Sequence, residues 1–164
     1  MATTHTTGGA RAVLVPLATG FEEIEAVTVI DVLRRAGLVV RVAGLAAREV
    51  TGAHGITLVA DGLLADVDAR ELALVVLPGG MPGTTNLAAD ARILALVREL
   101  ESTGRRVAAI CAAPLVLERA GVLAGREVTA YPSVRDKLAS ARVLTNPAVV
   151  SSGPVITSQG VGTA

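Results

Sequence analysis

The sequence predicts an α/β fold, a three-layer α/β/α sandwich built on a mostly parallel central sheet. Short continuous runs of Val, Leu and Ile recur along the chain, as in strands that are buried on both faces of a parallel sheet. Segments with the apolar spacing of helices separate these runs. The length of 164 residues allows one compact domain and is too short for two ordinary ones.

The first part of the chain shows this alternation clearly. The first helix ends at Gly37, because glycine readily adopts the left-handed conformation that closes a helix. Asp90 is the expected N-cap of a later helix, and a turn at residues 51–55 precedes a short strand or hairpin arm. In order, we predict a strand at 12–18, a helix at 22–36, strands at 38–45, 56–60 and 72–77, and a helix at 90–103.

The pattern weakens toward the C-terminus. A strand at 107–110 leads into a helix at 112–120 that Gly121 stops. We then expect a strand at 127–131, a short helix at 133–138 and hairpin arms at 149–151 and 155–158. Residues 160–164 form a small-residue turn of the kind that opens a helix. The prediction is therefore a flexible tail at residues 1–10 and a single domain at residues 11–164.

Composition excludes several classes of function. Fifteen Lys and Arg residues balance fifteen Asp and Glu residues, so there is no electrostatic basis for binding a nucleic-acid backbone or an anionic membrane. One Phe, one Tyr and no Trp exclude a base-stacking platform for single strands. There is no signal-peptide pattern and no apolar run of about 18 residues. We expect a soluble, cytoplasmic protein that binds neither nucleic acid nor membranes.

The single cysteine, Cys111, directly follows the predicted strand at 107–110 and precedes a helix. This order places the sulfur at a sharp strand-to-helix turn, where free N–H groups and the helix dipole favour an anion. A strained turn of this kind also presents the serine nucleophile of some hydrolases. We therefore predict a lowered thiol pKa and a reactive thiolate. The alternative is a buried structural cysteine.

Three carboxylates open the first helix. Favourable placement at the positive end of the helix dipole accounts for Glu22 and Glu23. Glu25 lies one turn before Val29 and shares the apolar face that must pack on the sheet. Burial there would raise the pKa of the Glu25 carboxyl and keep it as a proton donor. The alternative is a solvated or merely capping Glu25.

A pair of glycines follows the predicted strand at 72–77. Gly79 and Gly80 would let backbone N–H groups turn toward a bound oxygen, as an oxyanion hole requires, although an ordinary glycine turn has the same pattern. The two histidines, His5 and His54, stand at no ligand spacing, and one cysteine does not complete a metal site, so no metal is expected. We interpret His54 as a surface-turn histidine that could also reach a neighbouring site.

The combination of these motifs is more specific than any one of them. Glu-Glu-Ile-Glu stands at 22–25, Leu-Pro-Gly-Gly at 77–80 and Ala-Ala-Ile-Cys-Ala-Ala-Pro at 108–114, with further matching stretches at 31–37, 42–45, 128–132, 136–137 and 157–160. On these residues the chain resembles the DJ-1/PfpI family, which has a flavodoxin-like, class I glutamine-amidotransferase-like fold. The resemblance covers nearly the whole chain from Arg11 onward.

The resemblance implies roles for particular residues. Cys111 would be the reactive nucleophile and Glu25 its protonated carboxyl partner. Gly79, Gly80 and Ala112 would supply oxyanion-binding amides. No cofactor is implied. Relatives continue past residue 164 with a helix that covers the sheet, which this chain is expected to lack. Either the sequence is a fragment of a longer chain or the domain leaves an apolar face uncovered.

The chain departs from the family pattern at two positions that bear on function, and the resemblance also implies a dimer. The protease-like branch has a histidine base at the position of Ala112, so a peptidase is disfavoured. Tyr131 replaces a histidine often found near the nucleophile, and a phenol has too high a pKa to act as a base at neutral pH. The resemblance also implies a homodimer in which Arg34, Arg35 and His54 of one subunit approach the pocket of the other.

Three activities are consistent with this site. The leading hypothesis is a cofactor-independent enzyme that converts 2-oxoaldehydes such as methylglyoxal to hydroxy acids and acts on their early adducts, as in glyoxalase III or deglycase chemistry. The second is a redox-responsive stress or chaperone-like protein that senses oxidation through Cys111. The third is hydration of an isocyanide at the same thiolate. The substrate in the first and third cases is a small molecule.

Overall fold

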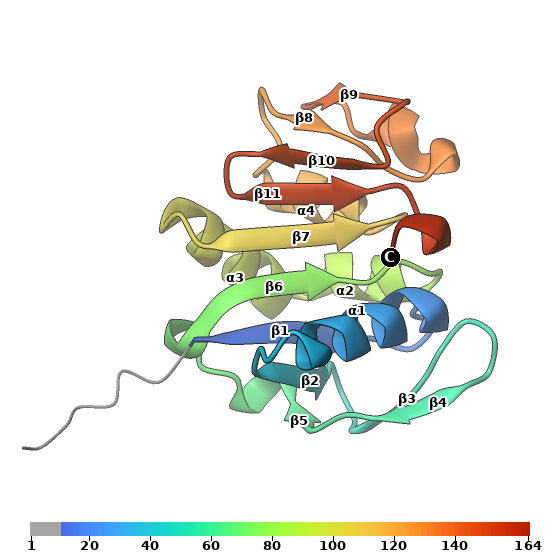
Figure 1. Cartoon of the computed structure of the whole chain (residues 1–164), viewed down its shortest axis with the longest axis vertical. Coiled ribbons are helices and arrows are strands. Elements are labelled where there is room, and N and C mark those ends of the chain that lie inside the picture. The colour runs from blue at the N-terminus through green and yellow to red at the C-terminus, as the bar shows by residue number, and fades with distance from the viewer. Residues whose placement is uncertain (1–10) are drawn as a thin grey trace, which may run out of the picture.

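The computed structural model describes residues 11–164, and the tail predicted at residues 1–10, with His5, lies outside the described residues. Seven strands form one sheet in the order β10-β11-β7-β6-β1-β2-β5, with every neighbouring pair parallel except β10 and β11 (Figure 1). The strands of this sheet are β1 (Ala12–Leu17), β2 (Val40–Gly44), β5 (Gly62–Leu63), β6 (Leu72–Leu77), β7 (Arg106–Ile110), β10 (Val149–Ser152) and β11 (Val155–Ser158).

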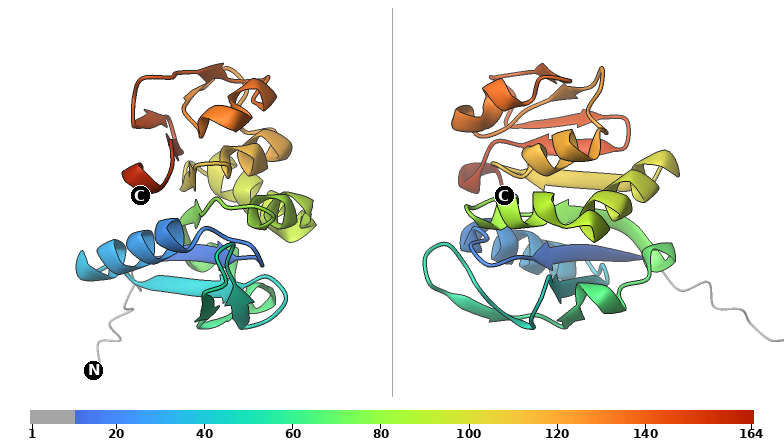
Figure 2. Two further views of the ribbon diagram at one scale, coloured as in Figure 1. Left: turned by 90° about the vertical axis from the view of Figure 1, so that its right-hand side faces the viewer. Right: turned by 180° about the vertical axis from the view of Figure 1, so that it is seen from behind.

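Helices cover both faces of the sheet. Helix α1 (Glu23–Arg35) lies on one face, and α2 (Gly83–Ala89), α3 (Ala91–Ser102) and α4 (Pro114–Ala120) lie together on the other (Figure 2). The predicted three-layer α/β/α architecture with a mostly parallel sheet is therefore confirmed. Within the described part of the chain, no helix combines the length and the apolarity that crossing a membrane requires.

The central strand β1 shows how the chain builds a core on each side of the sheet. All six residues of β1 are buried. Successive side chains of a strand point to opposite faces, so Leu14 packs under α3 and α4 while Val13 and Val15 pack under α1. Phe21 completes the α1 side and is fully buried, which contributes about 1.5 to 3 kcal/mol of hydrophobic free energy.

Two short pairs of strands, one antiparallel and one parallel, lie outside the main sheet. Strands β3 (Glu49–Thr51) and β4 (Thr57–Val59) form the predicted hairpin around residues 51–55. Strands β8 (Glu127–Val128) and β9 (Arg142–Val143) form a short parallel pair. Short 3₁₀ turns occupy Leu64–Asp66, Ala69–Glu71, Pro132–Lys137 and Val161–Thr163.

The structure corrects the prediction at several places. The helix predicted at 112–120 begins only at Pro114, because proline has no N–H to donate and is favoured in the first turn. Helix α2 was not predicted, since its sequence Gly-Thr-Thr-Asn-Leu-Ala-Ala has no apolar periodicity. The strand predicted at 127–131 ends at Val128, and the helix at 133–138 is a 3₁₀ turn.

On the face that carries α1, strands β7 and β11 are partly open. An apolar groove there is lined by Val29 of α1, Ala108 of β7, Ile156 of β11 and Val149 of β10, with Ala164 at its border. The side chains of Ala108 and Ile156 are only partly buried as a result.

Candidate active site

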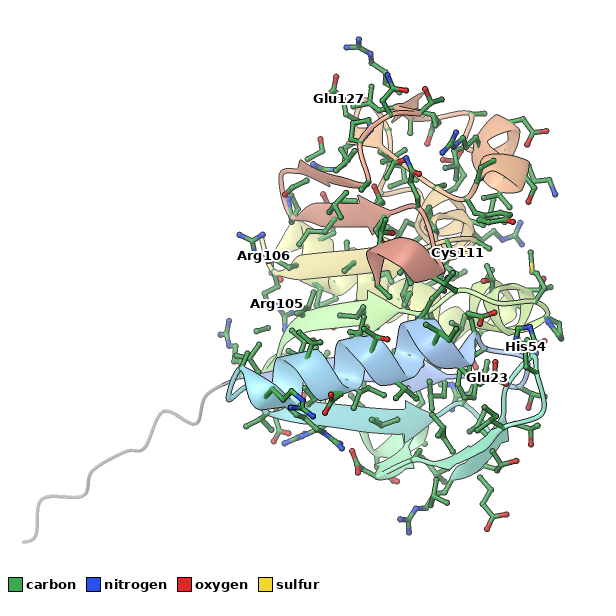
Figure 3. The ribbon with its side chains drawn as sticks, turned by 45° about the vertical axis from the view of Figure 1, so that its right-hand side comes forward. Glu23, His54, Arg105, Arg106, Cys111 and Glu127 are labelled. Atoms are coloured by element: carbon green, nitrogen blue, oxygen red, sulfur yellow. The ribbon has the colours of Figure 1, made fainter. Side chains whose placement is uncertain are left out.

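The carboxyl ends of β1, β6, β7 and β11 meet at one edge of the sheet, as parallel strands require (Figure 1). Each of these strands is followed by a turn that carries one of the motifs found in the sequence. Residues 20–25 follow β1, residues 78–80 follow β6 and Cys111 follows β7. The residues after β11 return the chain to the same edge, where Cys111 lies (Figure 3).

Cys111 has a strained backbone. Its φ of 63° makes it the one non-glycine residue with a positive φ in the described chain. The Cys111 N–H donates to the Ser158 carbonyl at 3.0 Å, and the Tyr131 N–H donates to the Cys111 carbonyl at 2.9 Å. A non-glycine residue in the left-handed region costs about 1 to 3 kcal/mol, and such strain concentrates at functional sites. Two flanking segments therefore hold the thiol in a defined position.

Glu25 lies beside this thiol and is fully buried. Its Oε2 accepts a hydrogen bond from the Gly79 N–H at 2.8 Å, whereas Oε1 has no hydrogen-bond partner among residues 11–164. The absence of a side chain at Gly79 makes this packing possible. A Cβ there would lie 2.7 Å from Glu25 Oε2 and 2.8 Å from Cys111 Cβ.

The two acids share one buried environment. Burial raises the pKa of Glu25, as predicted, with the nearby Glu22 charge adding to the effect. Burial also raises the pKa of the Cys111 thiol to about 12, together with the charge and hydrogen bonding of Glu25. The prediction of a lowered thiol pKa is therefore wrong: desolvation outweighs the hydrogen bond from the Ala112 N–H. Protonation of Glu25 removes its charge and makes its O–H a donor toward the sulfur, so the thiolate depends on a protonated Glu25.

The amides predicted to bind an oxyanion do not all remain free. The Gly79 N–H donates to Glu25, which corrects its predicted role as an oxyanion donor. The Gly80 N–H has no acceptor within the described residues, and the Ala112 N–H faces the sulfur. Gly80 has a φ of 88°, and a Cβ there would lie 2.3 Å from the Glu22 nitrogen. Gly80 therefore offers an amide without an acceptor among residues 11–164, whereas the Ala112 amide is directed at the sulfur.

Tyr131 and Gly160 border the sulfur on another side. A Cβ built at Gly160 would lie 3.9 Å from the Cys111 Sγ and 3.5 Å from Tyr131 Cδ2. Gly160 itself is buried, whereas the Tyr131 side chain is 49% exposed. The structure therefore brings Tyr131 to the thiol, where the sequence predicted it, and adds Gly160, which the sequence analysis missed.

The β3–β4 turn meets the start of α1 through Glu23, which is buried rather than merely placed at the helix dipole. Its Oε1 accepts from the His54 N–H at 2.7 Å, and His54 Nδ1 lies 3.0 Å from its Oε2 (Figure 3). Burial opposes ionisation of Glu23, but these hydrogen bonds and one from the Ile56 N–H outweigh it and hold its pKa below the usual value. The bond to Glu23 and the Glu22 and Glu23 charges raise the pKa of His54.

This turn is also where the structure brings metal-ligating groups together. Glu22, Glu23 and His54 each offer a ligand atom, all within 4.8 Å of one another. The sequence spacing did not suggest such a cluster, because its members come from two segments about 30 residues apart. The Glu23 carboxylate already accepts three hydrogen bonds, two from His54 and one from Ile56, and the His54 side chain is exposed.

Residues 11–164 match the model of one protein family, and that family is described as the DJ-1/PfpI family. The chain belongs to the DJ-1/PfpI family. The resemblance seen in the sequence motifs is therefore confirmed over the whole described chain.

Family members from several organisms align with most of the chain. It is 42% identical over 156 residues to Protein dj-1beta of Drosophila melanogaster, covering 94% of this chain and 83% of that protein. The crystal structure of that protein superposes with a TM-score of 0.91 at 41% identity, covering 94% of this chain and 84% of that one. A Caenorhabditis elegans relative named glutathione-independent glyoxalase DJR-1.2 is 40% identical over 144 residues, covering 87% of this chain and 76% of that protein.

A structure described as oxidized DJ-1 of Toxoplasma gondii superposes with a TM-score of 0.87 at 36% identity, covering 94% of this chain and 84% of that one. These likenesses to DJ-1/PfpI proteins show family and fold.

Two residues named from the family resemblance lie away from the thiol within this chain. Arg34 and Arg35 are in the last turn of α1, and α1 begins at the edge that holds Cys111. Arg34 pairs with Asp61 at 3.0 Å and Arg35 with Asp31 at 2.7 Å. Ten residues of helix span about 15 Å, so the arginines lie near the opposite edge of the sheet.

Proposed function

We propose that this DJ-1/PfpI protein is a cysteine-dependent enzyme that converts 2-oxoaldehydes such as methylglyoxal to 2-hydroxy acids without a bound cofactor. The observation that carries the proposal is the strained Cys111 thiol held against a buried Glu25 carboxyl that has one unpartnered oxygen. A nucleophile beside a buried acid with a raised pKa is the arrangement that thiol addition followed by proton transfer needs.

In the first step, the Cys111 thiolate adds to the aldehyde carbon C1 and forms a hemithioacetal. The new oxyanion accepts hydrogen bonds from the Gly80 and Ala112 amides, which supports its formation at little reorganisation cost. Glu25 gives its proton to the substrate oxygen and becomes the base for the next step. Gly79 contributes by holding Glu25 Oε2, not by binding the oxyanion.

In the second step, the Glu25 carboxylate takes the C1 proton, and the electron pair forms a C1–C2 double bond while the C2 oxygen becomes the oxyanion of an enediolate. Glu25 then returns that proton to C2, and the C1 hydroxyl proton passes to the C2 oxygen, which leaves a thioester at C1 and a hydroxyl at C2. Water attacks the thioester, the C–S bond breaks, and the thiol and a hydroxy acid are released. Methylglyoxal and one water thus become lactic acid with no net oxidation or reduction.

The name of the Caenorhabditis elegans relative, glutathione-independent glyoxalase, supports this reaction class, since it names a glyoxalase that works without glutathione. The single cysteine supports it as well, because one reduced thiol suffices for the scheme. We assign the activity to the cytoplasm, where free thiols stay reduced.

The test is lactate formation from methylglyoxal in the absence of glutathione. We expect Cys111→Ser to abolish the activity and Glu25→Gln to lower kcat by at least about a hundred-fold, the usual contribution of a positioned acid-base group. Glu49→Gln is the matched control, since Glu49 is an exposed glutamate of β3. Unchanged rates in Cys111→Ser or Glu25→Gln would refute the mechanism.

Homodimer formation is part of the same proposal. Ile24 and Val27 of α1 and Val59 of β4 are 56%, 46% and 67% exposed. We call these three residues the α1–β4 patch. A second copy packed on this patch would cover apolar side chains that a monomer leaves in water, and it would bring a neighbouring subunit close to the His54 turn.

The same unpartnered oxygen of Glu25 supports a second function. The unpartnered Glu25 Oε1 beside the sulfur could donate a hydrogen bond, when protonated, to an oxidised Cys111. Peroxide would convert the thiolate to a sulfenate and then to a sulfinate, each step consuming one peroxide and releasing one water. Intact mass after mild peroxide tests this function: a stable gain of two oxygens in the wild type, lost in Cys111→Ser, is the expected result. No such gain would exclude it.

A further inference from the structure

The space next to the Cys111 sulfur is bounded on two sides by other residues. It lies between the ring of Tyr131 and the backbone of Gly160, which come from two segments separated by about 30 residues of sequence. A methyl group at Gly160 would contact both the sulfur, at 3.9 Å, and Tyr131 Cδ2, at 3.5 Å. Both distances are ordinary van der Waals contacts, so one methyl group would fill this space without a clash.

Both walls of this slot are held in place. The Tyr131 N–H bonds to the Cys111 carbonyl, which ties the tyrosine directly to the nucleophile. Gly160 is held by Thr163, whose N–H and hydroxyl both donate to the Gly160 carbonyl at 2.8 and 2.9 Å. The Gly160 N–H in turn donates to Thr163 Oγ1 at 3.0 Å. These bonds fix the backbone on both sides of the slot relative to the sulfur, so the Gly160 backbone and the position of the Tyr131 ring set the room beside the sulfur.

Other groups adjoin Cys111 away from this slot. Gly79 packs against Glu25 and the Cys111 Cβ, and the Ala112 amide faces the sulfur. Among residues 11–164, the Tyr131 ring and the Cys111 sulfur lie within 4 Å of a methyl group at Gly160, and no charged side chain does. The lining of the slot therefore suits a small uncharged group rather than a branched or ionic one.

We propose that Gly160 and Tyr131 set the width of the slot at the Cys111 sulfur and restrict the substrate to 2-oxoaldehydes whose substituent is about the size of methyl or hydroxymethyl. The choice of substrate class rests on the proposed function, whereas the width of the slot does not. Gly160 and Tyr131 are specificity-determining residues in this proposal.

Alkylation of Cys111 tests the slot without requiring turnover. In iodoacetamide and iodoacetanilide the thiolate forms the same S–C bond and displaces the same iodide, but the second reagent carries a phenyl group. We expect Gly160→Ala to lower the iodoacetanilide to iodoacetamide rate ratio by at least about ten-fold, the discrimination that one methylene gives in a tight pocket. Tyr131→Ala should raise the ratio, and Tyr131→Phe should leave it unchanged.

Gly162→Ala is the matched control, because a Cβ at Gly162 would have no neighbour within 4 Å. Thermal unfolding of each variant reports whether it folds; if Gly160→Ala does not, Tyr131→Ala carries the test. The slot is refuted if Tyr131→Ala leaves the ratio unchanged, or if a folded Gly160→Ala slows both reagents equally.

Turnover of methylglyoxal and phenylglyoxal separates this inference from the proposed function. Size-dependent alkylation with no turnover of either aldehyde would refute the proposed function and leave the slot intact. Turnover of both aldehydes with equal kcat/KM, unaltered in the Gly160 and Tyr131 variants, would refute the slot and leave the proposed function intact.

Discussion

At the scale of single residues, the site couples the fully buried Glu25 carboxyl to the half-buried Cys111 thiol. Burial disfavours the charge on both groups, and the Glu25 carboxylate further disfavours a charge on Cys111. The state with a protonated Glu25 and a thiolate, or the reverse, therefore carries a single negative charge. In the proposed reaction that charge moves to a substrate oxygen, which the Gly80 and Ala112 amides would then bind.

The raised pKa of Glu25 predicts how stability depends on pH. Below 4.5, the carboxyl is protonated in both the folded and the unfolded chain. Above it, the unfolded chain releases the proton while the folded protein keeps it, so stability falls as pH rises toward the folded pKa and then levels off. We expect Glu25→Gln to lack this fall and to be more stable than the wild type at neutral pH.

Urea unfolding across this range, kept below the thiol titration, measures the effect, and each pKa unit corresponds to about 1.4 kcal/mol. Glu49→Gln should keep the wild-type slope. Parallel curves for the wild type and Glu25→Gln would show that Glu25 is ionised in the folded protein.

Gly79 gives a steric prediction at the same scale. A Cβ at this position would lie 2.7 Å from Glu25 Oε2, 2.8 Å from Cys111 Cβ and 3.0 Å from the Ile110 carbonyl. We expect Gly79→Ala to lower the free energy of unfolding by about 1 to 3 kcal/mol, as overpacking of a core does. Gly62→Ala is the control, because Gly62 has open space around its Cβ position, and its change should stay within about 0.5 kcal/mol. Equal effects of the two substitutions in urea unfolding would contradict this account.

At the scale of elements, sequence signals predicted helices well where local chemistry defines their ends. Asp90 caps α3 by accepting from the Arg92 N–H, and Gly121 ends α4 with a φ of 79°. Both signals are local. The burial of Glu23 could not be predicted in this way, because its partners lie in the β3–β4 turn. Gly52 is the sequence feature that reflects the burial of Glu23, because a Cβ at Gly52 would lie 2.3 Å from Glu23 Oε1.

The Glu23–His54 contact predicts a pH window for the order of the β3–β4 turn. Glu23 has a lowered pKa. Its contribution to the stability of the turn is therefore present above pH 4.5 and is lost as pH falls through the pKa of the folded state. His54 has a raised pKa, so its contribution is present below 6.5 and is lost as pH rises through the folded value. The amides of His54 and Ile56 should therefore be most protected between these limits.

Hydrogen-exchange protection factors, corrected for intrinsic exchange, measure this window. We expect His54→Ala to remove the loss of protection at higher pH and Glu23→Gln to lower protection throughout. His5→Ala serves as the control for histidine removal. A profile unchanged in both turn variants would show that the turn is held by other contacts.

At the scale of the whole molecule, the fold could be predicted because buried parallel strands leave a continuous apolar signature in the sequence. The gathering of Cys111, Glu25 and the paired glycines could be predicted from one rule, that parallel strands end at one edge. The slot beside the sulfur could not be predicted, because the pairing of β11 with β7 is what brings Gly160 close to Tyr131. Nor could the sequence show that the Gly79 N–H donates to Glu25, because that hydrogen bond joins residues 54 positions apart.

The α1–β4 patch leads to a prediction about assembly. If a second copy covers it, Val27→Asp would bury an unpaired carboxylate in the interface. Such a charge costs about 3 kcal/mol or more, so the dissociation constant should rise at least about a hundred-fold. Sedimentation velocity over a concentration series measures this change. Val149→Asp is the matched control, because Val149 is similarly exposed but borders the groove over β7 and β11. A dimer that survives Val27→Asp and dissociates in Val149→Asp would move the interface to that groove.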